Sequence, residues 1–153
     1  MKNKKIIILI ALVLIAGAVF FGYKLLNKNT KRLVDSKSDL VISATDLVKK
    51  FETDEAAANK EFLGSKLDYV ITVTGLVKEI TKDETGAYTV ILGDSTTRSS
   101  VRCSMDSLQN QEVASLKTGN PASIKGAITG FNTDDLGIGS DVVLNRCVVE
   151  AKK

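Results

Sequence analysis

The 153-residue chain contains no histidine and no tryptophan. The lack of histidine excludes serine–histidine–aspartate and cysteine–histidine nucleophiles, and it excludes metal sites ligated by histidine. It also removes the side chain whose ordinary pKa suits acid–base catalysis near neutral pH. These absences remove the easiest routes to catalysis without excluding it altogether. We therefore expect a non-catalytic protein with no cofactor and no metal site.

Acidic residues are absent from the first 32 positions, which carry seven basic ones. Residues 33–153 hold 14 basic and 18 acidic residues, a net charge of −4, although the whole chain carries +3. Proteins that bind polyanions nonspecifically need clustered lysine and arginine, because their affinity comes from counterion release. The acidic balance of the larger part of the chain therefore argues against nucleic acid as its partner.

Residues 6–23 form an uninterrupted run of 18 uncharged, mostly apolar side chains. As a helix this run would be about 27 Å long, close to the thickness of the hydrocarbon core of a bilayer. The alternative is a cleaved signal peptide, because basic residues precede the run and the small residues 16–18 resemble a cleavage site. We favour a membrane anchor, because the apolar run continues past that site.

The orientation of this segment is indicated mainly by the short tail before it. Three lysines precede the segment and four basic residues follow it, so the positive-inside bias is nearly balanced. A five-residue tail favours the usual signal-anchor arrangement, which places the body outside the cytoplasm, either periplasmic or extracellular. We expect a single-pass membrane protein with an anchor or signal peptide at 1–26, a polar linker at 27–40 and a folded domain at 41–153.

A helix is expected at the start of the folded domain. Apolar residues recur at helical spacing from Leu47 to Phe62, Ser43 or Thr45 can cap the helix, and Gly64 can end it. We interpret the phenylalanines in this stretch as core residues.

The spacing of apolar residues changes to two from Asp68 onward, which predicts five strands beginning near residues 69, 88, 101, 121 and 141. A helix over Ser107–Lys117 is expected between the third strand and the fourth. Gly75 would bend the first strand so that it serves both halves of a curled sheet, and Gly126 would mark the bend of the fourth. This order is typical of the OB-fold, a five-stranded Greek-key barrel. We predict a mainly β fold of this type, with a preceding α-helix and an N-terminal transmembrane helix.

The sequence also resembles the tRNA_anti-like family, a bacterial OB-fold family named for its likeness to tRNA anticodon-binding domains. The resemblance covers about residues 41–150 and implies a fold, not nucleic-acid binding; similar members often follow a signal or anchor segment and have no assigned activity. Ile128 stands where a cysteine is often found in this family. The matching stretches are DEAAANKEFLGSKL, ITVTGLVKEI, YTVILGD, VRCSM, LKTGNPASIKG and DVVLNRCVV.

Cys103 and Cys147 are the only cysteines. In an exported domain this pair suggests a disulfide between the third strand and the fifth, which would contribute about 3–4 kcal/mol by loop-entropy arguments. The alternative is two buried free thiols, which a cytoplasmic location would favour.

The loop NTDDLGIGSD, residues 132–141, has some features of a calcium-binding loop. However, Leu136 and Val143 occupy positions at which an EF-hand needs oxygen ligands. A looser site made by Asp134, Asp135 and Asp141 is the alternative, but we interpret the stretch as a solvated hairpin loop.

The ligand face of an OB-fold lies across its second and third strands and the loops after its first and fourth strands. Tyr88 or Phe131 would stack on a base or sugar ring there, and basic side chains would meet an anion. The alternative is that these side chains belong to the core and the ordinary surface. We expect a binding module for a protein or a small polar ligand; the alternative is a domain that binds single-stranded nucleic acid or an oligosaccharide. The candidate ligand-binding residues are Lys82, Tyr88, Arg98, Arg102 and Phe131.

Overall fold

The computed structural model describes Leu33 and residues 36–64, 69–133 and 138–150. Within these residues no helix is both long enough and apolar enough to cross a membrane, and the predicted span at 6–23 lies outside them. The elements, in chain order, are β1 (Leu40–Ser43), α2 (Ala44–Thr53), α3 (Glu55–Phe62), β2 (Val70–Lys82), β3 (Tyr88–Gly93), β4 (Ser100–Met105), the 3-10 helix η2 (Ser107–Gln109), α4 (Asn110–Ala114), β5 (Pro121–Asn132) and β6 (Asp141–Val149).

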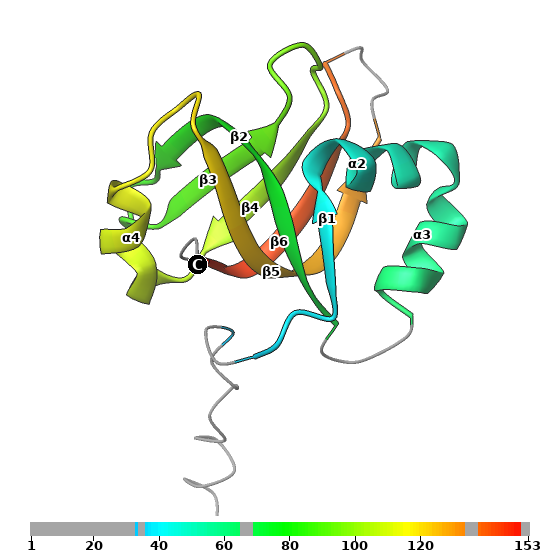
Figure 1. Cartoon of the computed structure of the whole chain (residues 1–153), viewed down its shortest axis with the longest axis horizontal. Helices are drawn as coiled ribbons and strands as arrows, with labels where there is room; N and C mark the ends of the chain where they lie inside the picture. The colour runs from blue at the N-terminus through cyan, green and yellow to red at the C-terminus, as the bar shows by residue number, and fades with distance from the viewer. Residues whose placement is uncertain (1–32, 34–35, 65–68, 134–137, 151–153) are drawn as a thin grey trace, which may run out of the picture. The chain divides into compact units, whose positions relative to one another are not determined.

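Five of the six strands close into a barrel (Figure 1). The long strand β2 pairs with β5 along Val70–Leu76 and with β3 along Leu76–Lys82, so it serves both halves of the curled sheet. Around the barrel the order is β2-β3-β4-β6-β5, and β5 returns to β2. Strands β4 and β6 are parallel, and the other neighbours in the barrel are antiparallel. The predicted closed five-stranded barrel is confirmed.

The irregularity in β2 lies at Lys78, where the pairing with β3 skips one residue between Val77 and Glu79. Gly75, at which we expect a bend, pairs regularly with Ala122 on β5, and the strand changes its partner from β5 to β3 at the next residue, Leu76. An extra residue in a strand bends it locally and re-aims the side chain that it carries. Here that side chain is a lysine beside the β3–β4 loop.

The helical region before the barrel consists of two helices instead of the single one predicted. Asp54 separates them: its backbone is extended, with φ −154° and ψ 91°, and its side chain accepts a hydrogen bond from the Ala57 N–H to cap α3. The predicted cap at the start of α2 is confirmed, because Ser43 Oγ accepts a hydrogen bond of 3.0 Å from the Asp46 N–H.

A chain of aromatic contacts attaches these helices to the barrel. Phe131 on β5 stacks on Phe51 of α2 with ring centroids 5.1 Å apart. Phe51 in turn lies 5.7 Å from Phe62 of α3, and Phe62 lies 6.0 Å from Tyr69. These four rings are four of the five aromatic side chains after residue 32, so most of the aromatic surface is used to hold α2 and α3 in place.

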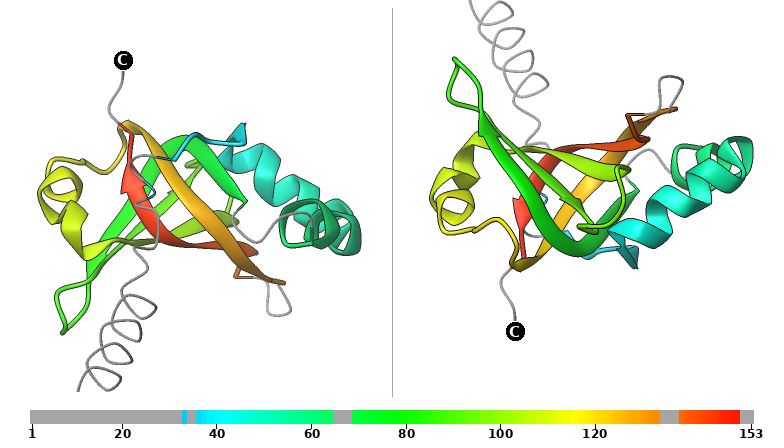
Figure 2. Two further views of the ribbon diagram at one scale, coloured as in Figure 1. Left: turned by 90° about the horizontal axis from the view of Figure 1, so that it is seen from below. Right: turned by 90° about the horizontal axis from the view of Figure 1, so that it is seen from above.

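Helices α2 and α3 lie on one side of the barrel, and α4 lies on the opposite side (Figures 1 and 2). Helix α2 covers the end at which β3 and β5 finish and β4 and β6 begin. The predicted 107–117 helix forms as η2 and the short α4 on the other side, where Asp106 caps it by accepting a hydrogen bond from the Leu108 N–H.

The hydrophobic core lies inside the barrel and beneath α2. Each large aliphatic side chain buried there stabilises the fold by about 1.5–3 kcal/mol relative to exposure. The fully buried set includes Leu47 of α2 and, from the strands, Ile71, Leu92, Val101, Ile124 and Leu144.

The chain before β1 also packs against the barrel. Leu33 is buried with Val70 of β2 and Val148 of β6, and the Lys125 ammonium of β5 donates a 2.8 Å hydrogen bond to the Ser36 carbonyl. We call the described residues of this stretch, Leu33 and 36–39, the strap. The strap and β1, which pairs in parallel with β2, were not predicted, so the described part of the expected linker at 27–40 lies on the folded domain.

Gly126 lies at a second irregularity, where the register between β5 and β6 shifts. A Cβ atom there would lie 2.7 Å from Cys147 Sγ and 3.2 Å from Leu144 Cδ2. Only a residue without a side chain allows β5 to pass so close to β6.

Gly126→Ala should therefore lower the free energy of unfolding by about 1–3 kcal/mol, because the added methyl group overpacks a buried site. Gly130→Ala on the same strand is the control: no atom lies within 4 Å of a Cβ there, so its effect should stay within about 0.5 kcal/mol. Chemical denaturation of both variants measures the difference. Equal effects would contradict the close approach at Gly126.

Candidate functional site

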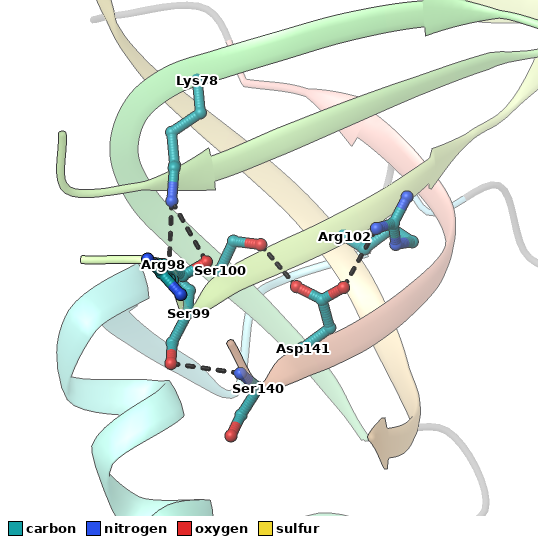
Figure 3. Close-up of polar contacts among 7 residues, drawn as sticks. All are labelled: Lys78, Arg98, Ser99, Ser100, Arg102, Ser140 and Asp141. Carbon is teal, nitrogen blue, oxygen red and sulfur yellow. Dashed lines mark hydrogen bonds and ion pairs between the residues drawn. The ribbon is translucent and has the colours of Figure 1, made fainter. Parts of the chain in front are cut away.

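Lys78 holds the loop between β3 and β4. Because it sits on the β2 bulge, its ammonium reaches three consecutive backbone carbonyls: Thr97 at 2.7 Å, and Arg98 and Ser99 at 3.4 Å each. Figure 3 shows the side chain extended from β2 onto this loop. One lysine thus satisfies several loop carbonyls and fixes the path of residues 97–99.

The same loop is fixed from two further directions. Ser99 Oγ donates a hydrogen bond of 2.8 Å to Glu52 on α2. The same Oγ accepts one of 3.2 Å from the Ser140 N–H (Figure 3). Gly139 packs on the loop backbone with φ +105°, and a Cβ there would lie 2.5 Å from the Arg98 carbonyl carbon. The loop is therefore clamped between α2, β2 and the start of β6.

Asp141 neutralises one of the predicted anion-binding residues. Its carboxylate accepts a hydrogen bond from Ser100 Oγ and forms a 3.0 Å ion pair with Arg102 on β4 (Figure 3). Because the arginine side chain is 44% exposed, the pair adds little stability. It does place a negative charge against the guanidinium, which lowers its attraction for an external anion.

Asp94 begins the clamped loop and carries a firmly held negative charge. Its Oδ1 atom accepts hydrogen bonds of 2.8 Å from both the N–H and the hydroxyl of Thr96. These bonds hold the pKa of Asp94 below its usual value, and the bond from the Thr96 backbone N–H has the larger effect. The positive charge of Lys78 lowers this pKa further. The carboxylate is therefore ionised at neutral pH, and its Oδ2 atom takes part in neither bond.

A cleft of about 290 Å³ lies between α2 and this loop. Its floor is apolar and buried, and its rim carries charged and hydroxyl side chains. Helix α2 contributes Ala44, Thr45, Val48, Lys49 and Glu52. The end of β3 and the loop contribute Gly93, Asp94, Thr97 and Ser99.

A second recess of about 430 Å³ lies between α2 and α3. Its two walls are joined by a 2.8 Å ion pair between Lys50 and Glu61. Its lining is mostly charged or polar, and only Ala57 and Ala58 are apolar. We therefore consider the cleft beside α2, with its apolar floor and clamped wall, to be the better candidate site.

The structure does not gather the five predicted ligand-binding residues at one place. Lys82 lies over the Tyr88 ring, 5.0 Å from its centroid, at the start of β3. Arg98 is in the loop after the other end of β3, a strand that itself spans roughly 17 Å from Tyr88 to Gly93. Arg102 is paired with Asp141 as described.

The two predicted stacking residues, Tyr88 and Phe131, are partly buried and pack against the core. Phe131 is also the ring that stacks on α2. The residues that line the cleft, and the lysine that holds its loop wall, were missed, because a glutamate on a helix and a lysine in a strand carry no signal in the sequence. Only the Asp94–Thr96 turn follows a recognisable local pattern.

Cys103 and Cys147 are both free and fully buried in the core. Burial raises the pKa of the Cys147 thiol well above its usual value, and a hydrogen bond with the neighbouring Cys103 raises it further. The disulfide between them stays a prediction for an oxidising environment.

Across the described residues no cluster of three or more histidine, cysteine, aspartate or glutamate side chains is placed to hold a metal ion. Asp134 and Asp135 of the loose calcium site considered above lie outside those residues.

The barrel order, the parallel pairing of β4 with β6 and the helix between β4 and β5 define an OB-fold protein. A family model agrees with this class and matches residues 1–148. The chain belongs to the tRNA_anti-like family.

Several solved structures are similar to this chain, and the first one below shares its fold. A lipoprotein from Klebsiella pneumoniae, described as a candidate nucleic-acid binder, is 20% identical, with 71% of this chain and 91% of that chain covered and a TM-score of 0.52. A chain of the Stn1–Ten1 complex of S. pombe is 16% identical; the match covers 54% of this chain and 59% of that chain, with a TM-score of 0.38. An OBody bound to hen egg-white lysozyme is 14% identical, with coverages of 56% and 84% and a TM-score of 0.41. No curated protein matches the chain in sequence.

Lys78→Met should loosen the clamped loop, because it removes the donor shared by three carbonyls while keeping the length of the side chain. We expect faster amide hydrogen exchange across residues 94–99 and a loss of about 1–2 kcal/mol in the free energy of unfolding. Lys60→Met, at an exposed position on α3, is the control and should change neither quantity. Unchanged exchange in the Lys78 variant would contradict the clamp.

Proposed function

We propose that this protein is a membrane-anchored, extracytoplasmic OB-fold module that binds a protein or small polar ligand and catalyses no reaction. The observation that carries the binding role is the cleft beside α2, whose walls are fixed before any ligand arrives. Binding pockets are commonly preformed recesses with apolar linings and a few placed polar groups, which this cleft resembles on a small scale.

The tether is supported by the N-terminal sequence. Residues 6–23 are long enough and apolar enough to span a bilayer as a helix. The family match begins at residue 1, so it includes this run together with the barrel. We infer that the module acts at a membrane surface, through an anchor at residues 6–23.

The surface chemistry favours a ligand other than nucleic acid. Single-strand binders use exposed aromatic rings and a basic groove. Here four of the five rings after residue 32 connect the helices to the barrel, Arg102 is paired with Asp141, and residues 33–153 carry a net charge of −4. The alternative is a domain that binds single-stranded nucleic acid or an oligosaccharide; the description of the Klebsiella lipoprotein names nucleic acid as a candidate ligand of that protein.

A topology reporter tests the location. Alkaline phosphatase fused after Lys153 and expressed in a bacterial host should be active, because the enzyme needs an oxidising compartment outside the cytoplasm. The fusion should stay in carbonate-washed membranes with its N-terminus intact, whereas a cleaved signal peptide would release a shortened product. A fusion that starts at Leu33 is the control and should be inactive; an inactive full-length fusion would contradict the proposed location.

Titration with a labelled oligonucleotide tests the choice of ligand class. The full chain in detergent micelles should show no binding to single-stranded DNA at micromolar protein and low salt. Binding that weakens steeply as salt is raised would identify contacts to phosphates and favour the alternative.

A further inference from the structure

We propose that the cleft beside α2 binds a zwitterion of amino-acid size, with its carboxylate at Lys49 and its ammonium at Asp94 and Glu52. The inference rests on the proposed function and deepens it by naming the class of ligand.

The size of the cleft sets the first limit. Its volume of about 290 Å³ corresponds to roughly ten water-sized groups at about 30 Å³ each. This is room for a free amino acid. The floor, made by Ala44, Val48 and Gly93, is buried and offers apolar contact to an aliphatic side chain.

The charges on the rim of the cleft limit which charged groups a ligand can carry. Lys49 and Glu52 lie one turn apart on α2, and Asp94 faces the helix from the loop. The bonds to Thr96 use only Oδ1 of Asp94, and the bond from Ser99 uses only Oε1 of Glu52. Each carboxylate therefore keeps its second oxygen for a ligand donor.

Charge complementarity favours a ligand that carries both charges. An anion without an amine would meet two carboxylates, and an amine without an acid group would meet the Lys49 ammonium. A zwitterion satisfies both signs at once. Because Lys78, Ser99 and Gly139 already fix the loop wall, binding pays little for ordering the site.

The experiment uses the full chain in detergent micelles and three matched compounds. L-leucine carries both charges, isoamylamine lacks the carboxylate and isocaproate lacks the amine, on nearly the same aliphatic chain. We expect calorimetric heat and a raised unfolding temperature with leucine at millimolar concentration, and neither effect with the other two. The remaining common amino acids then map the preferred side chain.

Two cleft variants and two controls locate the site. Lys49→Gln and Asp94→Asn should each weaken leucine binding by about tenfold or more, since each removes a charged hydrogen-bond partner. Asn keeps an oxygen for the Thr96 turn. Asp83→Asn is the control, because Asp83 makes the same kind of turn with Thr85 at the β2–β3 hairpin; Lys60→Gln is the matching lysine control. Both controls should bind as the original chain does.

The proposal is overturned if no common amino acid binds at millimolar concentration, if the amine or the acid alone binds as tightly as leucine, or if both cleft variants bind normally. This result is separate from the test of location. A barrel outside the cytoplasm that binds no zwitterion overturns the inference alone. A cytoplasmic barrel that binds leucine at the cleft overturns the proposed location alone.

Discussion

The stacking of Phe51 on Phe131 determines how the rest of this molecule can be used. It fixes α2 across one end of the barrel, and the contact of Phe51 with Phe62 extends the attachment to α3. Without this fixed helix there would be no wall opposite the β3–β4 loop and therefore no cleft. The same contact packs the Phe131 ring against α2, so this ring is not available to stack on a base or a sugar. The contact that holds the helix therefore also limits which ligands the barrel can bind.

The opposite wall of the cleft depends on a backbone irregularity. The extra residue in β2 is Lys78, and its ammonium binds three consecutive backbone carbonyls of the loop. Gly139 and Ser140, which lie just before β6, also contact this loop. A single bulge thus links three strands that are distant in sequence at one end of the barrel.

Local patterns were sufficient to predict the barrel and the Ser43 cap, because alternation and capping depend on neighbouring residues. The break at Asp54 was missed, because an aspartate within a helical pattern can equally be a surface residue. The cleft could not be predicted from the sequence for a different reason. Its contacts join Lys78 to Thr97 and Glu52 to Ser99, which are 19 and 47 residues apart, and they exist only once the barrel has closed.

The strap has a consequence for where a truncated protein can begin. Lys125 is 5% exposed, and its ammonium lies against the Ser36 carbonyl and 3.5 Å from Glu150. Cutting the chain at β1 would remove that carbonyl and the Leu33 side chain together, opening an apolar surface beside a partly desolvated cation. The smallest autonomous unit therefore starts upstream of β1, at or before Leu33, although the barrel strands begin only at Val70.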